Sequence, residues 1–149
     1  MTRENAAQLL SQMNVPEEID LLSIDVDQNT YYVWEVLAQY RPRLVVVEYN
    51  AALPPNVDWK VAYSADKIWD GTMNFGASLK ALELLGRKLG YSLVGCNLTG
   101  VNAFFVRDDL VGDLFENPFT ADNHFEPLRY ALNHRDGHML SSLDRNSVG

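Results

Sequence analysis

The sequence has little basic charge, hardly any cysteine and no long apolar run. Its 12 lysine and arginine residues stand against 20 aspartate and glutamate residues, for a formal net charge of −8. Such a chain offers no basic surface to a nucleic-acid backbone, so we expect no nucleic-acid partner. The apolar runs are too short to cross a membrane. The N-terminal MTRENAAQLLSQM carries acids and amides where a signal peptide has its apolar core. We therefore expect a cytoplasmic protein.

The single cysteine, Cys96, excludes an internal disulfide and fits a reducing compartment. It lies in an apolar run, which favours a small buried side chain over a nucleophile. Apolar residues make up 47% of the chain, which indicates a globular rather than a disordered protein. A length of 149 residues fits one domain spanning 1–149, and we find no internal repeat.

The order of apolar segments predicts an α/β fold. Continuous apolar runs at 20–25 and 43–49 indicate strands, and YSLVGC and VNAFFVRD around the turn NLTG indicate a hairpin. Because helical patterns alternate with the first two strands, we expect those strands to lie parallel and side by side, followed by the antiparallel hairpin. The helical patterns cover residues 2–14, 29–39 and 76–89, with short ones at 108–116 and 122–135.

A long irregular segment, 50–75, separates the second predicted strand from the clearest helix. Loops of this length in compact domains are often lids or binding loops. Its aromatic residues Trp59, Tyr63 and Trp69 are candidates for the wall of a substrate pocket. The simpler interpretation is that they anchor the loop to the core.

Polar side chains follow both parallel strands where each strand ends. Asp25 and Asp27 follow the first, and Glu48 and Asn50 follow the second. Because ligands bind beyond the carboxyl ends of such strands, and neighbouring strands lie close, we expect these groups to converge on one crevice. Residues two apart in an extended run point to the same side. Three carboxylates and an amide oxygen suit Mg²⁺, and a bound ion there would favour the alkoxide of a substrate hydroxyl.

Other interpretations of these polar residues stay open. Asp27 is also placed to cap the helix that follows it, and Glu48 is a possible partner for an arginine. His134 and His138 have the spacing of helical metal ligands, but Gly137 interrupts the helix, so a solvated tail is the better interpretation.

Four stretches in this order, LLSIDVDQNTYYVWEVL, RPRLVVVEYNA, GASLKALELLGRKLGYSLVG and GVNAFFVRDDL, resemble the C-terminal half of FkbM-type S-adenosylmethionine-dependent methyltransferases. The resemblance covers about residues 15–112. It implies a class I methyltransferase fold: here a partial Rossmann-like sheet of two parallel strands plus a C-terminal antiparallel hairpin, flanked by helices. It also implies an S-adenosylmethionine cofactor and a small-molecule acceptor with a hydroxyl group.

The resemblance assigns roles to residues at two strand tips. Asp25 and Asp27 would lie at the tip of the family's fourth strand as catalytic residues. Glu48, Tyr49 and Asn50 would bind the substrate at the tip of the fifth. Related metal-dependent O-methyltransferases carry an acid and an acid–amide pair at these tips, which makes Asp25, Asp27, Glu48 and Asn50 the candidate ligands for Mg²⁺. In this chain Tyr49 separates the acid from the amide.

The sequence departs from the family pattern in three ways. Relatives usually carry glycine at the position of Gln28 and an acid at the position of Thr30. The chain contains no G-x-G, and nothing before Asp20 resembles the glycine-rich turn that holds the cosubstrate. We therefore expect the cosubstrate half to be absent and methyl transfer to be incomplete in this chain. The alternatives are a non-catalytic truncated α/β domain that acts as a dimerising module, or a module that binds a metal or small ligand.

Without the family's first strands, the strand at 20–25 would present an open apolar edge. Such edges pair or aggregate unless they are covered. Two-fold pairing of identical subunits is the commonest solution, so we expect a homodimer through the edge near residues 20–25. Cover by the N-terminal helix is the alternative.

Overall fold

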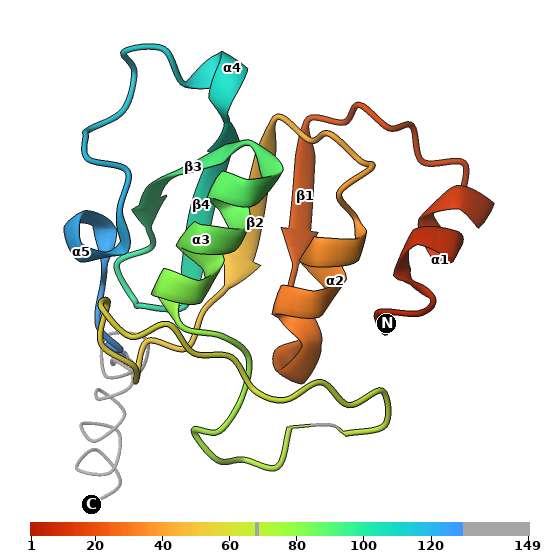
Figure 1. The fold of residues 1–149 in the computed structure, drawn as a ribbon, viewed down its shortest axis with the longest axis horizontal. Coiled ribbons are helices and arrows are strands. Elements are labelled where there is room, and N and C mark those ends of the chain that lie inside the picture. The colour runs from red at the N-terminus through yellow and green to blue at the C-terminus, as the bar shows by residue number, and fades with distance from the viewer. Residues whose placement is uncertain (68, 130–149) are drawn as a thin grey trace, which may run out of the picture.

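The computed structural model describes residues 1–67 and 69–129 and shows a four-stranded mixed sheet with helices packed against it (Figure 1). The sheet order is β1-β2-β4-β3, in which β1 and β2 are parallel and β4 is antiparallel to both of its neighbours. The predicted α/β class, the parallel pair and the C-terminal hairpin are confirmed. The strands are β1 Leu21–Ile24, β2 Leu44–Glu48, β3 Tyr91–Cys96 and β4 Asn102–Arg107. The helical elements are α1 Ala6–Gln12, η1 Asp27–Asn29, α2 Thr30–Val36, α3 Leu79–Leu89, α4 Asp108–Val111 and α5 Ala121–His124.

β2 occupies an inner position in the sheet because its β-branched run suits a strand bonded on both sides. Its register aligns Val47 with Ile24 of β1 and with Ala103 of β4. Val45 and Val47 are fully buried, while the alternate residues of β2 are partly exposed. β2 therefore has one face in the core and one face that is less covered.

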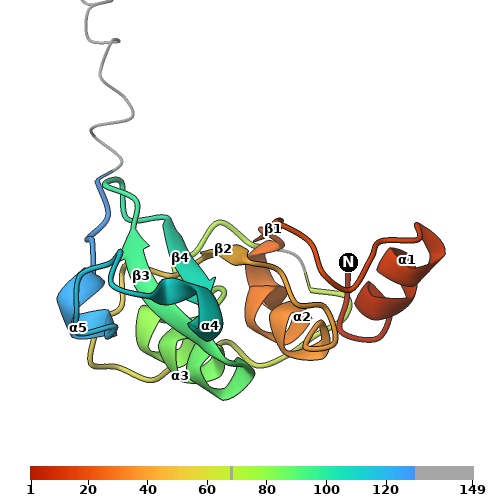
Figure 2. The same cartoon turned by 90° about the horizontal axis from the view of Figure 1, so that it is seen from above.

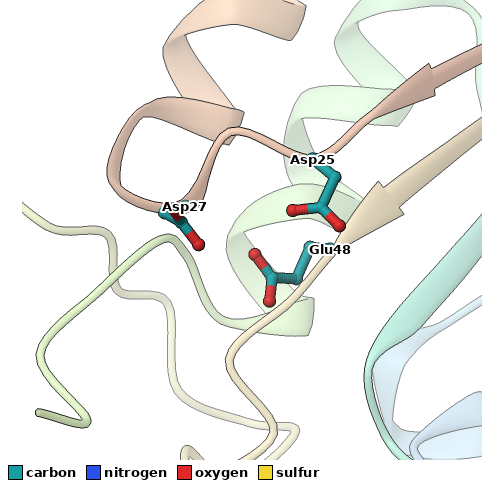
Figure 3. A group of neighbouring side chains, drawn as sticks. All are labelled: Asp25, Asp27 and Glu48. Carbon is teal, nitrogen blue, oxygen red and sulfur yellow. The ribbon is translucent and has the colours of Figure 1, made fainter. Parts of the chain in front are cut away.

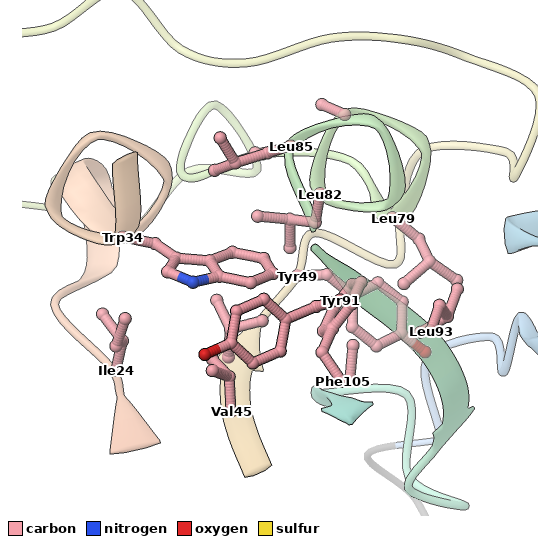
Figure 4. Close-up of a cluster of buried hydrophobic side chains, with 14 of the residues drawn as sticks. Ile24, Trp34, Val45, Tyr49, Leu79, Leu82, Leu85, Tyr91, Leu93 and Phe105 are labelled. Carbon is pink, nitrogen blue, oxygen red and sulfur yellow. The ribbon is translucent and has the colours of Figure 1, made fainter. Parts of the chain in front are cut away.

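Helices α2 and α3 lie on the same side of the sheet (Figure 2). The core fills the space between these helices and the sheet, with Trp34 of α2 packed 4.8 Å, centroid to centroid, from the ring of Phe105 on β4 (Figure 4). Leu82 and Leu85 of α3 are buried in the same cluster. On the opposite side of the sheet, Leu44 is only partly buried.

Helix α3 has a capping residue at each end, and these residues set where the helix begins and ends. Ser78 is extended, and its Oγ accepts a hydrogen bond from the backbone N–H of Ala81 at 3.1 Å. Gly90 has φ +85° at the C-terminal end, a left-handed conformation that glycine adopts without strain. The predicted stop at Gly90 is confirmed, and the start lies three residues later than the expected 76 because Ser78 is the cap.

The other predicted helices are shorter than expected. α1 spans Ala6–Gln12 rather than 2–14, and Asn14 with φ +54° has already left the helical conformation before the proline at 16. α4 covers only the start of the segment 108–116. α5 ends at His124 because Phe125 is extended, so the expected helix at 122–135 is wrong for 125–129. Its remainder, and both His134 and His138, lie outside the described residues.

The segment after β2 is irregular, as predicted, and is fastened to the body of the protein by isolated contacts. Lys60 forms one antiparallel bridge with Ala77, and the Tyr32 hydroxyl of α2 donates a hydrogen bond to Val61 O at 2.8 Å. Within residues 1–67 and 69–129, no helix has the length and apolar character needed to cross a lipid bilayer.

Candidate functional site

The carboxyl ends of β1 and β2 bring three predicted acids together. Asp25 follows β1 directly, Asp27 opens the 3-10 turn η1, and Glu48 is the last residue of β2. Each contributes a carboxylate oxygen to a group in which all three oxygens lie within 4.8 Å of one another (Figure 3). Because β1 and β2 are parallel neighbours, their tips necessarily share one edge of the sheet. We call Asp25, Asp27 and Glu48 the acid crevice.

The three acids differ in exposure, and this difference defines an inner and an outer side of the crevice. Asp25 and Asp27 are exposed, while Glu48 is partly buried. The Oε2 atom of Glu48 is fully buried and has no hydrogen-bond partner among the described residues. Among those same residues no lysine or arginine lies within ion-pair distance of Glu48, so the arginine-partner interpretation finds no support.

The electrostatics of Glu48 follow from this position. Burial, and then the negative charges of Asp25 and Asp27, raise the pKa of the Glu48 carboxyl from 4.5 to about 7. A buried carboxylate without a donor needs either a proton or a cation to offset its charge. The crevice is therefore built to attract positive charge.

This raised pKa predicts a pH-dependent stability for the ion-free protein. A carboxyl pKa that is higher in the folded state contributes stability that is complete below about pH 4.5 and is lost as the pH rises to about 7. Because glutamine does not ionise, replacing Glu48 by glutamine removes this loss of stability at high pH. Because the side chain stays partly solvated, we expect Glu48→Gln to stabilise the protein by only about 1–2 kcal/mol at pH 8. Urea unfolding in a chelating buffer at pH 5 and pH 8 measures this difference.

At pH 5 the same substitution should change the free energy of unfolding much less, which provides an internal control. A Glu48→Gln variant that is destabilised equally at both pH values would contradict the raised pKa.

The structure places the other predicted site residues elsewhere. Asn50 is 1% exposed, its Nδ2 donates to Met73 O at 2.7 Å and to Phe75 O at 3.0 Å, and its Oδ1 accepts from Ala52 N. Tyr49 is buried in the core, and its hydroxyl donates to Glu126 O at 2.6 Å. Both side chains therefore make structural contacts outside the acid crevice.

Two buried residues next to Asp27 were not among the site residues predicted from the sequence. Gln28 and Asn29 are buried, and each uses its side-chain amide to donate to a loop carbonyl, Asn74 O at 3.4 Å and Ser64 O at 3.0 Å. Each also keeps a buried side-chain oxygen without a partner among the described residues. The one signal in the sequence was the departure from the family's glycine at Gln28.

Asp27 does not act as a helix cap. Its φ is +49°, and the residue at the N-cap position of α2 is Asn29, whose side chain makes no capping hydrogen bond. The Asp27 side chain is thus free to face the crevice, where Figure 3 shows it beside Glu48.

A larger hollow of about 530 Å³ lies away from the acids. It begins at Asp20 and Arg43, at the opposite ends of β1 and β2 from the crevice, and its remaining wall is apolar. Lacking a cluster of converging polar groups, this hollow is a weaker candidate for chemistry than the acid crevice.

Comparisons of the chain with models of known families, with curated proteins and with solved structures gave no match.

Proposed function

We propose that the acid crevice binds one divalent cation of the Mg²⁺ type. The observation that carries this proposal is the convergence of three carboxylate oxygens within 4.8 Å, one of them from a glutamate whose Oε2 is buried without a partner. Carboxylates are the hard ligands that Mg²⁺ and Mn²⁺ prefer. Glu48 would hold the ion from the buried side, and Asp25 and Asp27 from the exposed side.

We further propose that this crevice is the acceptor site of S-adenosylmethionine-dependent O-methyl transfer to a hydroxyl group. The supporting features are the ordered resemblance over about residues 15–112 and a sheet in which two parallel strands lead into an antiparallel hairpin, as a partial Rossmann-like methyltransferase sheet requires. When bound, the cation would lower the pKa of an acceptor hydroxyl. One of the two exposed carboxylates, Asp25 or Asp27, would orient that hydroxyl by accepting its hydrogen bond. We assign no residue of this chain to the cosubstrate.

A calorimetric titration tests both parts of this proposal. The protein is titrated first with Mg²⁺ and Mn²⁺, and then with S-adenosylmethionine in the presence and absence of Mg²⁺. Saturable cation binding supports the site, and cosubstrate binding supports the enzyme. Cation binding without cosubstrate binding would leave a cation-binding module in place of a methyltransferase. Absence of cation binding would overturn the proposed site.

A second candidate function, dimerisation, is favoured by the free edge of β1. Within the part of the chain that the structure describes, β1 pairs with β2 alone, and Leu21 at its start is 54% exposed. Figure 1 shows α1 beyond this end of the sheet, and a cavity of about 170 Å³ remains between β1 and residues Met1 and Leu10. An apolar edge of this kind is a template for another strand. We propose that two copies pair through β1 about a two-fold axis.

Replacing Leu21 by lysine should convert such a dimer to a monomer, because a charged side chain at the edge opposes strand pairing. Light scattering coupled to size-exclusion chromatography measures the mass directly. Leu98→Lys, at another exposed leucine in the turn between β3 and β4, is the matched control and should leave the mass unchanged. A monomeric wild-type protein at high concentration would rule out the dimer.

A further inference from the structure

Two buried amides fasten the long loop to the strand tips that carry the acids. Asn50, two residues after Glu48, donates to the carbonyls of Met73 and Phe75 at 2.7 and 3.0 Å. Gln28, directly after Asp27, donates to the carbonyl of the intervening Asn74 at 3.4 Å. Three successive loop carbonyls are thus held from both tips. We call Gln28 and Asn50 the clasp.

The clasp is shielded from water. Gln28 is 2% exposed and Asn50 is 1% exposed, so a lost hydrogen bond is not readily replaced by solvent. The loop also lies directly against the backbone of the crevice: a Cβ atom placed on Gly76 would be 3.4 Å from Asp27 O, and Asn50 N donates to Ala77 O at 2.8 Å.

Asp27 depends on these contacts more than the other two acids. Its φ of +49° is uncommon for a residue other than glycine, and such a conformation persists only where the surroundings hold it. The turn that contains it is tied to the loop by the amides of Gln28 and of Asn29, which donates to Ser64 O. The direction of the Asp27 carboxylate is therefore set by side chains that do not themselves belong to the acid crevice.

We propose that Gln28 and Asn50 are positioning residues for the cation: by holding the loop across the two strand tips, they keep Asp27 and Glu48 within reach of one ion. This inference rests on the proposed cation site. Side chains that orient metal ligands typically contribute 10- to 100-fold to metal affinity. In this inference Asn50 acts through the loop rather than as the direct ligand predicted from the sequence, since its Nδ2 donates to two loop carbonyls and its Oδ1 accepts from Ala52 N.

The test is a Mn²⁺ titration of the full chain, followed by the electron paramagnetic resonance signal of free Mn²⁺. The variants are Gln28→Met and Asn50→Leu, which are similar in shape to the native side chains and remove the hydrogen-bond donors. Tyr32→Phe is the matched control, because it removes a loop hydrogen bond, to Val61 O, that lies outside the clasp. Hydrogen exchange of the peptide spanning 73–77 is measured with and without Mn²⁺.

We expect both clasp variants to bind Mn²⁺ at least about tenfold more weakly and Tyr32→Phe to stay within about twofold of wild type. Bound Mn²⁺ should slow exchange of the peptide in the wild type, because coupling between ion and loop is reciprocal. If Asn50→Leu fails to fold, as judged by circular dichroism, Gln28→Met decides the question. Equal Mn²⁺ affinity in wild type and clasp variants would overturn this inference alone. A wild type that binds no Mn²⁺ would overturn the proposed site and this inference with it.

Discussion

Replacing Phe105 by alanine should lower the free energy of unfolding by about 3–5 kcal/mol. Phe105 is fully buried at the centre of the sheet, paired with Val45 on β2 and with Leu93 on β3. Its ring packs against Trp34 and against α3 at Gly86, where a Cβ atom would lie 2.8 Å from the ring carbons. Truncation opens a cavity between the sheet and the helices packed against it. Chemical denaturation monitored by tryptophan fluorescence and circular dichroism measures the loss.

The neighbouring residue on β4 supplies a matched control. Phe104 has the same side chain but lies on the opposite face of the sheet, where it is only partly buried and lines the 530 Å³ hollow. We expect Phe104→Ala to cost about 1–2 kcal/mol, because less apolar area is removed from contact. Equal losses for Phe104→Ala and Phe105→Ala would show that the two faces are equally covered, for example by a partner subunit on the open face.

The parts of the fold that were predictable from sequence are those fixed by local pattern. The β-branched run of β2 indicates a strand in an inner position of the sheet, and the α3 segment ends at a glycine. The shorter helices were overestimated because apolar spacing continues beyond the residues that end them. Asn14 leaves the helical conformation after α1, and Phe125 is extended after α5, and neither change has a strong local signal.

The candidate site, like the fold, was predictable from the sequence only in part. The meeting of Asp25 with Glu48 follows from topology alone, since parallel neighbours end at one edge. The position of the Asn50 side chain does not follow from topology. The chain leaves the strand after Glu48, so the alternation of side chains between the two faces of the sheet no longer applies. Its partner, Met73, is 23 residues further along the chain, and no pattern in the sequence connects them. Polar contacts made by irregular loops are therefore where sequence reasoning reached its limit.

Removing the carboxylate of Asp25 should weaken cation binding by at least about tenfold, because affinity at oxygen sites follows the number of charged ligands. Asp25→Asn keeps the shape of the side chain and removes one of the three carboxylates of the acid crevice. In calorimetric titration with Mn²⁺, the affinity should fall while the ion-free protein unfolds at the same or a slightly higher denaturant concentration, because repulsion with Glu48 is relieved.

Asp20→Asn is the control that separates cation binding by the acid crevice from attraction by the overall negative charge of the protein. Asp20 lies at the other end of β1, its side chain is 89% exposed, and its ion pair with Arg43 is a surface contact. Both variants remove one negative charge from a protein whose formal net charge is −8. If long-range attraction by an acidic protein held the ion, Asp20→Asn and Asp25→Asn would weaken binding equally. If the acid crevice holds it, only Asp25→Asn weakens binding, and the difference between the two variants measures what the geometry of the strand tips contributes.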